Sequence, residues 1–225
     1  MVPVDRDDLE SIIRRLEDRS EAAGRHASRS MPRFAESHDL RDWEGRFSPQ
    51  GSRIYDSVLA QIHPDDVVLD IGAGDLRLAL RMAGRARRVY AVEVNPLIVS
   101  HALRIIGLDL PRNLYVICAN ALDFSFPSEV TVAVLLMRHC QHVQEYIRSL
   151  RGAGCGRLLT NARWKTGVES IDLAAPDLAF DDLHEGWYAC RCGATGYVGT
   201  GEKPDAVPIE VASCPACSEE RSCAG

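Results

Sequence analysis

The sequence predicts an α/β protein with a doubly wound, mostly parallel sheet and a small cysteine-rich unit after it. Short apolar runs alternate with segments whose apolar residues recur at helical spacing, and the loops between them are short. This alternation is typical of parallel strands joined by helices on both faces of one sheet. A glycine turn, at Gly72 and Gly74, directly follows the first apolar run. Two closely spaced cysteine pairs lie near the C-terminus, beyond the alternating segments.

The N-terminal region predicts one amphipathic helix and one irregular segment. The helix spans residues 5–23, and its apolar positions at helical spacing are Leu9, Ile12, Ile13 and Leu16. We expect this helix to pack on the domain or on a partner. Residues 24–49 are polar and irregular apart from Trp43 and Phe47, which either fold over a bound ligand as a lid or plug the edge of the domain.

A helix, a buried strand and a glycine turn come next. Ser48-Pro49 predicts the helix start because proline suits the first turn, and the apolar residues that follow are Ile54, Tyr55, Val58, Leu59 and Ile62. Val67 to Ile71 is a short apolar run of the kind that a parallel sheet buries on both faces. Gly72 and Gly74 lack a Cβ, so the backbone can turn tightly and approach a ligand. A helix from about Asp75 would aim its first amide groups at that ligand.

The remaining elements of the sheet follow in alternation. The predicted strands are residues 88–94, 114–118, 130–136 and 157–160. One helix begins at Asn95-Pro96 and reaches about Ile106, and another spans about Cys140 to Leu150. Residues 165–183 are acidic and mixed in character, and we expect a connection there with one short strand at 168–173.

Acidic residues end the first two strands, beside the glycine turn. Asp70 lies at the end of the first strand, and Glu93 lies at the end of the second, where an acid can accept both hydroxyl groups of a ribose. Because the carboxyl ends of neighbouring parallel strands meet at one edge of a sheet, these features predict a nucleoside-cofactor pocket. The dinucleotide fingerprint G-x-G-x-x-G is broken, since Arg77 takes the place of its third glycine.

The segment from Asp70 to Gly74 resembles motif I of class I S-adenosylmethionine (SAM)-dependent methyltransferases, an acid followed by x-G-x-G. Glu93 matches the acid of that family at the end of strand two, and residues 114–123 are similar to its third motif. Two positions depart from the family pattern: Asn120 stands where an acid is common, and Leu76 stands where many relatives have glycine. The resemblance covers about half of the chain. It implies a Rossmann-like methyltransferase fold with SAM as the cofactor, bound by Asp70, Gly72, Gly74, Glu93, Asn120 and Ala121.

In the methyltransferases that this segment resembles, the methyl acceptor lies near the end of the fourth strand. Enzymes that methylate the amino groups of adenine or glutamine commonly carry Asn/Asp-Pro-Pro-aromatic there, whereas this chain has Leu136-Met137-Arg138-His139, which argues against that type of chemistry. Arg138 and His139 are the candidate catalytic residues, with His139 as a general base because its ordinary pKa lies near neutrality. Alternatively, His139 caps or packs the following helix. After the fifth strand, Arg163 and Trp164 are candidates to stack on or bind the acceptor, and the alternative for Trp164 is that it closes the core.

Two cysteine pairs, Cys190-x-Cys192 and Cys214-x-x-Cys217, each follow a predicted strand, at 187–189 and at 207–211. Two such turns bearing thiolates can place four sulfur atoms in a tetrahedron around Zn²⁺. The pattern resembles a zinc ribbon, although the first pair is C-x-C where C-x-x-C is commoner. Rubredoxin-like iron binding by the same cysteines and disulfide bonds are the alternatives. Four cysteine ligands leave no open coordination position, so we expect a structural zinc that contributes folding energy.

Composition and charge narrow the class of protein. The chain has 225 residues, of which 46% are hydrophobic, and no apolar run approaches the length of a membrane-spanning helix. The formal net charge of −6 argues against broad, nonspecific binding of nucleic acid, although it is compatible with a local basic patch. The N-terminus is acidic without an apolar signal segment, and Cys118, Cys140 and Cys155 fall in or near predicted core elements. We therefore expect a cytoplasmic protein with reduced thiols.

These patterns predict four regions and one function. The regions are 1–48 (N-terminal helix and lid or docking segment), 49–164 (SAM-binding core), 165–184 (connection) and 185–225 (zinc-ribbon-like domain). We expect SAM-dependent methyl transfer to a macromolecule, either protein or RNA, with the cysteine-rich unit and the N-terminal helix as docking parts. The alternatives are a small-molecule methyltransferase and a noncatalytic SAM-binding subunit that acts through a partner.

Overall fold

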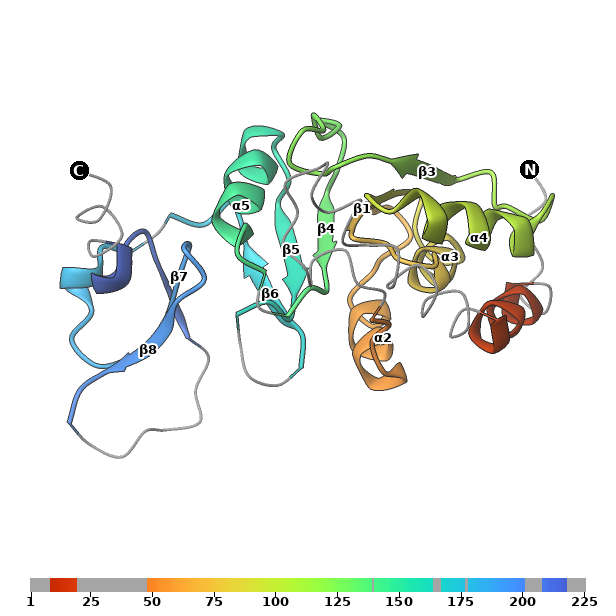
Figure 1. Cartoon of the computed structure of the whole chain (residues 1–225). Coiled ribbons are helices and arrows are strands. Elements are labelled where there is room, and N and C mark those ends of the chain that lie inside the picture. Colours follow the sequence, from red (N-terminus) through yellow and green to blue (C-terminus); the bar gives the residue numbers. More distant parts are fainter. Residues whose placement is uncertain are drawn as a thin grey trace.

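The computed structural model describes residues 9–19, 48–138, 140–163, 167–176, 178–200 and 208–217. Six strands form one sheet in the order β3-β2-β1-β4-β5-β6, and three form a second sheet in the order β8-β7-β9. Figure 1 shows the larger sheet with helices packed around it and the smaller sheet beyond β6, toward the C-terminus.

The larger sheet is mostly parallel, as predicted. Its strands are β1 (Val67–Ile71), β2 (Arg88–Glu93), β3 (Leu114–Cys118), β4 (Val132–Leu135), β5 (Arg157–Thr160) and β6 (Glu169–Asp172). β1 to β5 run parallel to one another, and β6 is antiparallel to β5. β1, β3 and β5 begin and end at the predicted residues, because glycine, proline, asparagine or aspartate bounds each apolar run.

Helices cover both faces of this sheet. They are α2 (Ser52–Leu59), α3 (Arg77–Ala83), α4 (Pro96–Ile106) and α5 (Val143–Gly152), and a further helix precedes them at residues 9–19. The helix at residues 9–19, α2, α3 and α4 bury apolar side chains against one face, and α5 buries its own against the other. All five residues of β1 are therefore buried, which explains why that strand reads as an almost continuous apolar run.

The helix at residues 9–19 packs on the domain. Its apolar stripe lies in one core cluster with α2, α3 and α4 and consists of Leu9, Ile12, Ile13 and Leu16. Arg81 on α3 donates to Glu17 at 3.1 Å, which ties the polar side of the helix to the same neighbour. A Cβ on Gly84 would lie only 3.0 Å from Leu9 Cδ2, so the helix passes close to the end of α3. The predicted amphipathic helix is confirmed over residues 9–19, and its apolar face there is occupied by the domain itself.

The predicted start of α2 is wrong. The helix begins at Ser52, not at Ser48-Pro49, and residues 48–50 have no regular structure. The backbone N–H of Gln50 donates to the Tyr55 hydroxyl at 3.0 Å, and the Gln50 side-chain amide donates to the Leu136 carbonyl at 3.3 Å. These two bonds hold the segment across the end of β4, so a tertiary contact overrides the local preference of the proline for a first helical turn.

The second sheet contains β7 (Gly186–Cys190), β8 (Thr195–Val198) and β9 (Ile209–Val211), and the 3₁₀ turn η1 (Phe180–Asp182) precedes it. β7 is antiparallel to β8 and parallel to β9. Trp187 and Tyr197 lie opposite each other on β7 and β8 with ring centroids 5.3 Å apart, whereas Tyr188 meets Phe180 at 5.0 Å. Because β7 and β9 run in the same direction, the cysteine pairs that follow them meet at one edge of the sheet.

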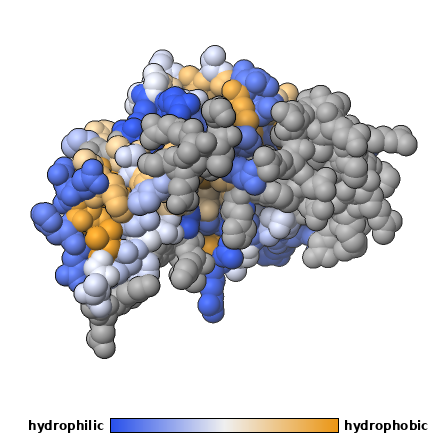
Figure 2. Space-filling model, turned by 60° about the vertical axis from the view of Figure 1, so that its left-hand side comes forward, coloured by the Kyte–Doolittle hydropathy of each residue, from blue (hydrophilic) through white to orange (hydrophobic). Residues whose placement is uncertain are grey.

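The surface of the described residues is chemically mixed. Hydrophilic side chains are spread over the face that Figure 2 shows, with hydrophobic areas between them. Apolar side chains that lie singly on a surface are ordinary in globular proteins. Within the described ranges, no helix has both the length and the apolar character that crossing a bilayer requires.

Candidate cofactor pocket and cysteine cluster

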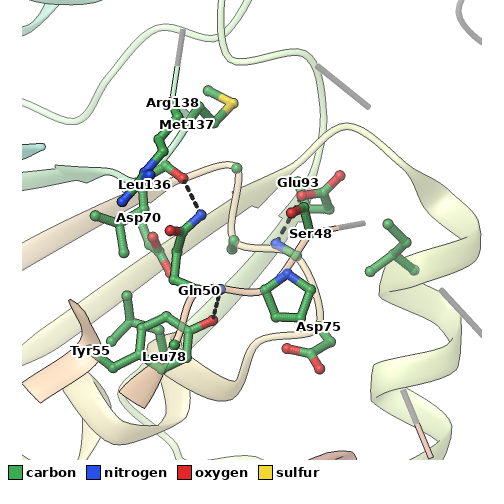
Figure 3. Close-up of a pocket in the computed structure, with 16 residues that line it drawn as sticks. Ser48, Gln50, Tyr55, Asp70, Asp75, Leu78, Glu93, Leu136, Met137 and Arg138 are labelled. Atoms are coloured by element: carbon green, nitrogen blue, oxygen red, sulfur yellow. Dashed lines mark hydrogen bonds between the residues drawn. The ribbon is translucent and has the colours of Figure 1, made fainter. Parts of the chain in front are cut away.

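A cavity of about 500 Å³ lies where β1, β2 and β4 end (Figure 3). Its walls are Ser48, Pro49, Gln50, Gly51, Tyr55, Asp70, Gly72, Ala73, Gly74, Asp75, Leu78, Glu93, Ile98, Leu136, Met137 and Arg138. The predicted site residues Asp70, Gly72, Gly74, Glu93 and Arg138 are therefore brought together at one cavity. Its volume falls in the range that small organic ligands and cofactors occupy.

The glycine turn adopts a left-handed backbone conformation. Gly72 has a φ of 75° and Gly74 a φ of 57°, values that other residues rarely take. The N–H groups of Gly72 and Ala73 donate to the Val92 carbonyl at 2.9 and 3.0 Å, which fastens the turn to β2. Leu76 also has a positive φ of 67° and is fully buried. The turn thus keeps a glycine-like conformation at the position where the resembled family often has glycine, with strain at one residue.

Glu93 is held at the cavity wall by backbone amides. Its Oε2 accepts the N–H of Gly74 at 2.9 Å, and its Oε1 accepts the N–H of Asn95 at the same distance. The side chain is buried, and burial raises the pKa of Glu93 while these donors oppose that rise. The two bonds fix the orientation of the carboxylate, and its remaining lone pairs can accept further donors such as the hydroxyl groups of a ribose.

Asp70 lies beside Glu93 without comparable compensation. It is 3% exposed, and within the part of the chain that the structure describes its Oδ2 has no hydrogen-bond partner. Burial, and secondarily the charge of Glu93, raises the pKa of Asp70 to about 7. The third carboxylate of the cavity, Asp75, is paired with Arg77 at 2.7 Å. Asp70 is therefore the group in this wall whose negative charge a positively charged ligand would stabilise most.

A smaller space of about 40 Å³ adjoins the cavity and contains the other two predicted cofactor residues. Asn120 and Ala121 line it, and Gly72, Glu93 and Met137 line both spaces. The backbone N–H of Leu122 donates to Asn120 Oδ1 at 3.1 Å, which orients the amide. The structure therefore places the segment that follows β3 next to the glycine turn, as the resemblance implies.

Gln50, Tyr55 and Met137 line the cavity, although the sequence analysis did not identify them as site residues. Gln50 donates to the Leu136 carbonyl, and its Oε1 accepts from Asn161 Nδ2 at 3.2 Å (Figure 3 shows the first of these bonds). Burial raises the pKa of Tyr55 to about 12, so its hydroxyl keeps its proton. No cavity role was predicted for Gln50, because the helix predicted from Ser48-Pro49 would have placed it inside a regular element.

The two candidate catalytic residues differ in what the structure describes. Arg138 is exposed and borders the cavity, so a substrate at the cavity mouth can reach it. His139 lies outside the described residues, as do Trp43, Phe47 and Trp164. The general base, the lid and the acceptor contact predicted for these residues stay predictions.

The four predicted metal ligands form one cluster. The Sγ atoms of Cys190, Cys192, Cys214 and Cys217 all lie within 4.8 Å of one another. The Sγ–Sγ separations are 3.6 Å for Cys190–Cys217, 3.7 Å for Cys192–Cys214 and 3.8 Å for Cys214–Cys217. A tetrahedron of thiolates at about 2.3 Å from a zinc ion has sulfur atoms about 3.8 Å apart, whereas a disulfide has sulfur atoms about 2.05 Å apart. These donors fit a tetrahedral metal ion.

Arg163 connects the cysteine cluster to the larger sheet and does not line the cavity. Its side chain is fully buried and pairs with Glu169 at 3.0 Å and with Glu210. Its Nη1 also donates to the Cys190 carbonyl at 3.3 Å. Burial alone would lower the pKa of Arg163, but the two carboxylates outweigh burial and raise it. The acceptor contact considered for Arg163 is therefore replaced by a role in joining β6 to β9.

Comparison with known proteins gives partial sequence matches. No protein-family model matches the chain. It is 41% identical over 70 residues to the probable ribosomal RNA small subunit methyltransferase A of Methanosarcina acetivorans, a stretch that covers 31% of this chain and 25% of that relative. It is 28% identical over 162 residues to the protein of the same name from Methanococcoides burtonii, covering 61% and 58%. The chain thus spans only about a quarter of the length of the first of these relatives.

Solved structures give partial matches as well. A dimethyladenosine transferase from Plasmodium falciparum has a TM-score of 0.43 at 20% identity, covering 49% of this chain and 41% of that one. An RNA methyltransferase from Salinibacter ruber, in complex with S-adenosyl-L-homocysteine, has a TM-score of 0.42 at 21% identity, covering 50% and 76%.

Proposed function

We propose that this protein transfers a methyl group from SAM to RNA. The observation that carries the proposal is the cavity of about 500 Å³, in which a glycine turn and the fixed carboxylate of Glu93 converge with Asp70, whose Oδ2 has no partner among the described residues. A nucleoside ligand needs a close backbone and an acceptor for its hydroxyl groups at the carboxyl ends of parallel strands. The stretch that is 41% identical to a probable ribosomal RNA methyltransferase supports SAM as the cofactor and RNA as the acceptor.

The residues of the cavity have separate tasks in this proposal. Glu93 accepts the ribose hydroxyl groups, and Asp70 faces the positive charge of the ligand. Asn120 and Ala121 border the smaller space and hold the base. SAM supplies a methyl group on a sulfonium, an electrophile that needs alignment with the acceptor more than activation. Arg138, exposed at the cavity mouth, can pair with a phosphate group of the RNA and so help to align it.

The other acceptor classes make different predictions. A small-molecule methyltransferase should turn over with low-molecular-weight extracts, and a noncatalytic subunit should bind SAM without turnover. The apolar face of the N-terminal helix is buried in the domain and cannot dock a partner. A docking role for this helix is therefore limited to its polar face. The cysteine-rich unit keeps its proposed docking role.

We also propose that the four cysteines hold a structural zinc ion. The sulfur separations support this, and the absence of a fifth protein donor from the cluster agrees with a closed shell among the described residues. Metal analysis of the purified protein distinguishes zinc from iron. A rubredoxin-like centre would also colour the protein, and the metal found would be iron.

The first test is calorimetric titration of the zinc-loaded protein with SAM and with S-adenosylhomocysteine. We expect both to bind, and Glu93→Ala to weaken both because the ribose loses its acceptor. Glu129→Ala is the matched control, since Glu129 is an exposed acid that pairs with Arg88 away from the cavity. Absence of binding to wild-type protein would overturn the cofactor assignment.

The second test uses SAM with a radiolabelled methyl group and three cell fractions: RNA, protein and small molecules. Label in the RNA fraction, abolished by ribonuclease and by Glu93→Ala, is the expected result. Label in another fraction would transfer the proposal to that acceptor class. Binding of SAM without labelling of any fraction would favour the noncatalytic subunit.

A further inference from the structure

Three residues form the partition between the cavity and the smaller space beside it. Met137 lines both the space of about 500 Å³ and the space of about 40 Å³, together with Gly72 and Glu93. A Cβ built on Gly72 would lie 3.2 Å from Sδ, 3.5 Å from Cγ and 3.6 Å from Cε of Met137. The methionine therefore lies along the glycine turn over most of its length. Gly72 has no side chain and Glu93 is held by two backbone amides, so Met137 is the movable part of the partition.

The two spaces differ in chemistry as well as in size. The larger carries the carboxyl group of Asp70, which suits a positively charged group, and that of Asp75, which Arg77 already pairs. The smaller has apolar walls that include Ile71, Val94 and Ala121, with Asn120 and His142 as polar members. Apolar walls with a few polar edges suit a flat heteroaromatic ring. Because Glu93 borders both spaces, a ribose held there would send its base into one space and its other substituent into the other.

The smaller space cannot take a base as it stands. Its volume of about 40 Å³ compares with about 150 Å³ for a protein cavity that binds benzene. A purine is larger than benzene, so the partition must move before one can enter. Methionine is suited to such a movement, since its side chain is unbranched and has three rotatable bonds. Gly72 has no side chain that would oppose it.

We propose that Met137 is a gate, closed in this structure, that must swing away from Gly72 before the adenine ring of SAM can enter the smaller space. The proposal rests on the proposed function, because it takes SAM as the ligand. A ligand that binds only the open form has its apparent dissociation constant raised by the reciprocal of the open fraction. The gate therefore slows and weakens binding of any ligand with an adenine ring, and leaves a ligand without one unaffected.

The test compares Met137→Ala, which removes the partition, with Met137→Leu, which conserves its bulk. We expect Met137→Ala to raise the association rate constant for S-adenosylhomocysteine and for 5′-methylthioadenosine by about tenfold, as for an open fraction of about one tenth. Met137→Leu should stay at or below the wild-type rate. S-methylmethionine, which has the sulfonium and the amino acid but no base, should bind all three proteins alike. Equal association rate constants in wild type and Met137→Ala would overturn the gate.

A second readout follows the gate directly. The chain has 4 methionines, so protein labelled with ¹³C at the methionine methyl groups gives a simple spectrum. The Met137 signal is the one missing from Met137→Leu, and Met82, fully buried in α3, is the reference. S-adenosylhomocysteine should shift the Met137 signal and leave Met82 in place. An unshifted Met137 signal in saturated protein would contradict the proposal.

The outcomes separate the gate from the proposed function. If wild type binds S-adenosylhomocysteine and Met137→Ala binds it no faster, the gate fails and the cofactor assignment stands. If only Met137→Ala binds, the cofactor assignment fails for wild type, and Met137 is a fixed wall and not a gate. If none of the folded proteins binds it, both the gate and the cofactor assignment fail.

Discussion

Asp70 is a carboxyl group whose ionised form the fold disfavours. Burial and Glu93 raise its pKa from 3.8 to about 7. Between about pH 4 and 7 the unfolded chain releases this proton and the folded chain keeps it, so the free energy of unfolding falls as the pH rises through that window. The full difference corresponds to about 4 kcal/mol.

We expect Asp70→Asn to remove this pH dependence in the ligand-free protein. The stability advantage of the variant over wild type should be larger at pH 8 than at pH 4, as measured by urea unfolding at both pH values. A variant whose stability falls with pH as steeply as that of wild type would show that another group is responsible. The gain at high pH would also mean that wild type accepts a less stable fold to keep an acid beside the cavity.

At Leu76, backbone strain and side-chain burial have opposite effects on the free energy of unfolding. Its positive φ of 67° costs about 1 kcal/mol, while loss of a fully buried leucine side chain costs about 2–5 kcal/mol. We therefore expect Leu76→Gly to lower the free energy of unfolding by about 2 kcal/mol. Gly74→Ala is the matched control, since a Cβ there meets nothing within 4 Å and only the left-handed backbone opposes it. A Leu76→Gly variant as stable as wild type would mean that the free-energy cost of the backbone strain equals the free energy gained by burying the side chain.

At this scale the sequence predicted cavity residues that lie at strand ends and in the glycine turn, and missed those placed by contacts. Asp70, Gly72, Gly74 and Glu93 could be predicted because each occupies a defined place relative to a strand end. Gln50, Met137 and the role of Arg163 could not, because what they touch comes from distant parts of the chain.

Among the elements, β5, β6 and β9 are joined by one buried cation. Arg163 follows β5, Glu169 begins β6, and Glu210 lies in β9. We expect Arg163→Ala to lower the free energy of unfolding by about 3 kcal/mol or more, because two partly buried carboxylates lose their partner. Arg15→Ala should leave it nearly unchanged, since the Arg15–Asp109 pair is exposed on both sides. Similar losses in urea unfolding for both variants would contradict a special role for Arg163.

Element boundaries were predicted well where turn residues bound an apolar run, and poorly where a tertiary contact sets the boundary. α4 begins as predicted because Asn95 caps it, with its Oδ1 accepting from Leu97 N–H at 3.0 Å, and a proline opens the first turn. α5 begins at Val143, later than predicted, because Cys140 N–H donates to the Met137 carbonyl in a turn. Nothing local in the sequence distinguishes that turn from a first helical turn.

For the whole molecule, the question is how far the cysteine cluster and the cavity depend on each other. No cysteine of the cluster lines the cavity. We expect Cys217→Ser to release zinc and lower the melting temperature, while the affinity for S-adenosylhomocysteine changes by less than about twofold, as for sites that share no partners. Metal analysis and calorimetry check both parts.

Cys118→Ser is the control for this experiment, since Cys118 is exposed and lies outside the cluster. It should retain zinc and the wild-type melting temperature. Loss of S-adenosylhomocysteine binding in Cys217→Ser alone would show that the cavity needs the metal-bound unit to form.

The segment that follows β5 contacts both the cavity and the cysteine cluster within three residues. Asn161 bonds Gln50 at the cavity, and Arg163 bonds the Cys190 carbonyl at the cluster. A protein engineer therefore cannot replace one of the two units without regard to the other. A cysteine-rich tail grafted from another protein would need its own carboxylate where Glu210 stands, or the buried Arg163 would keep Glu169 as its one carboxylate partner. Exchange of such tails between ancestral proteins would have met the same requirement. We therefore expect substitutions at Arg163 and Glu210 to have occurred together.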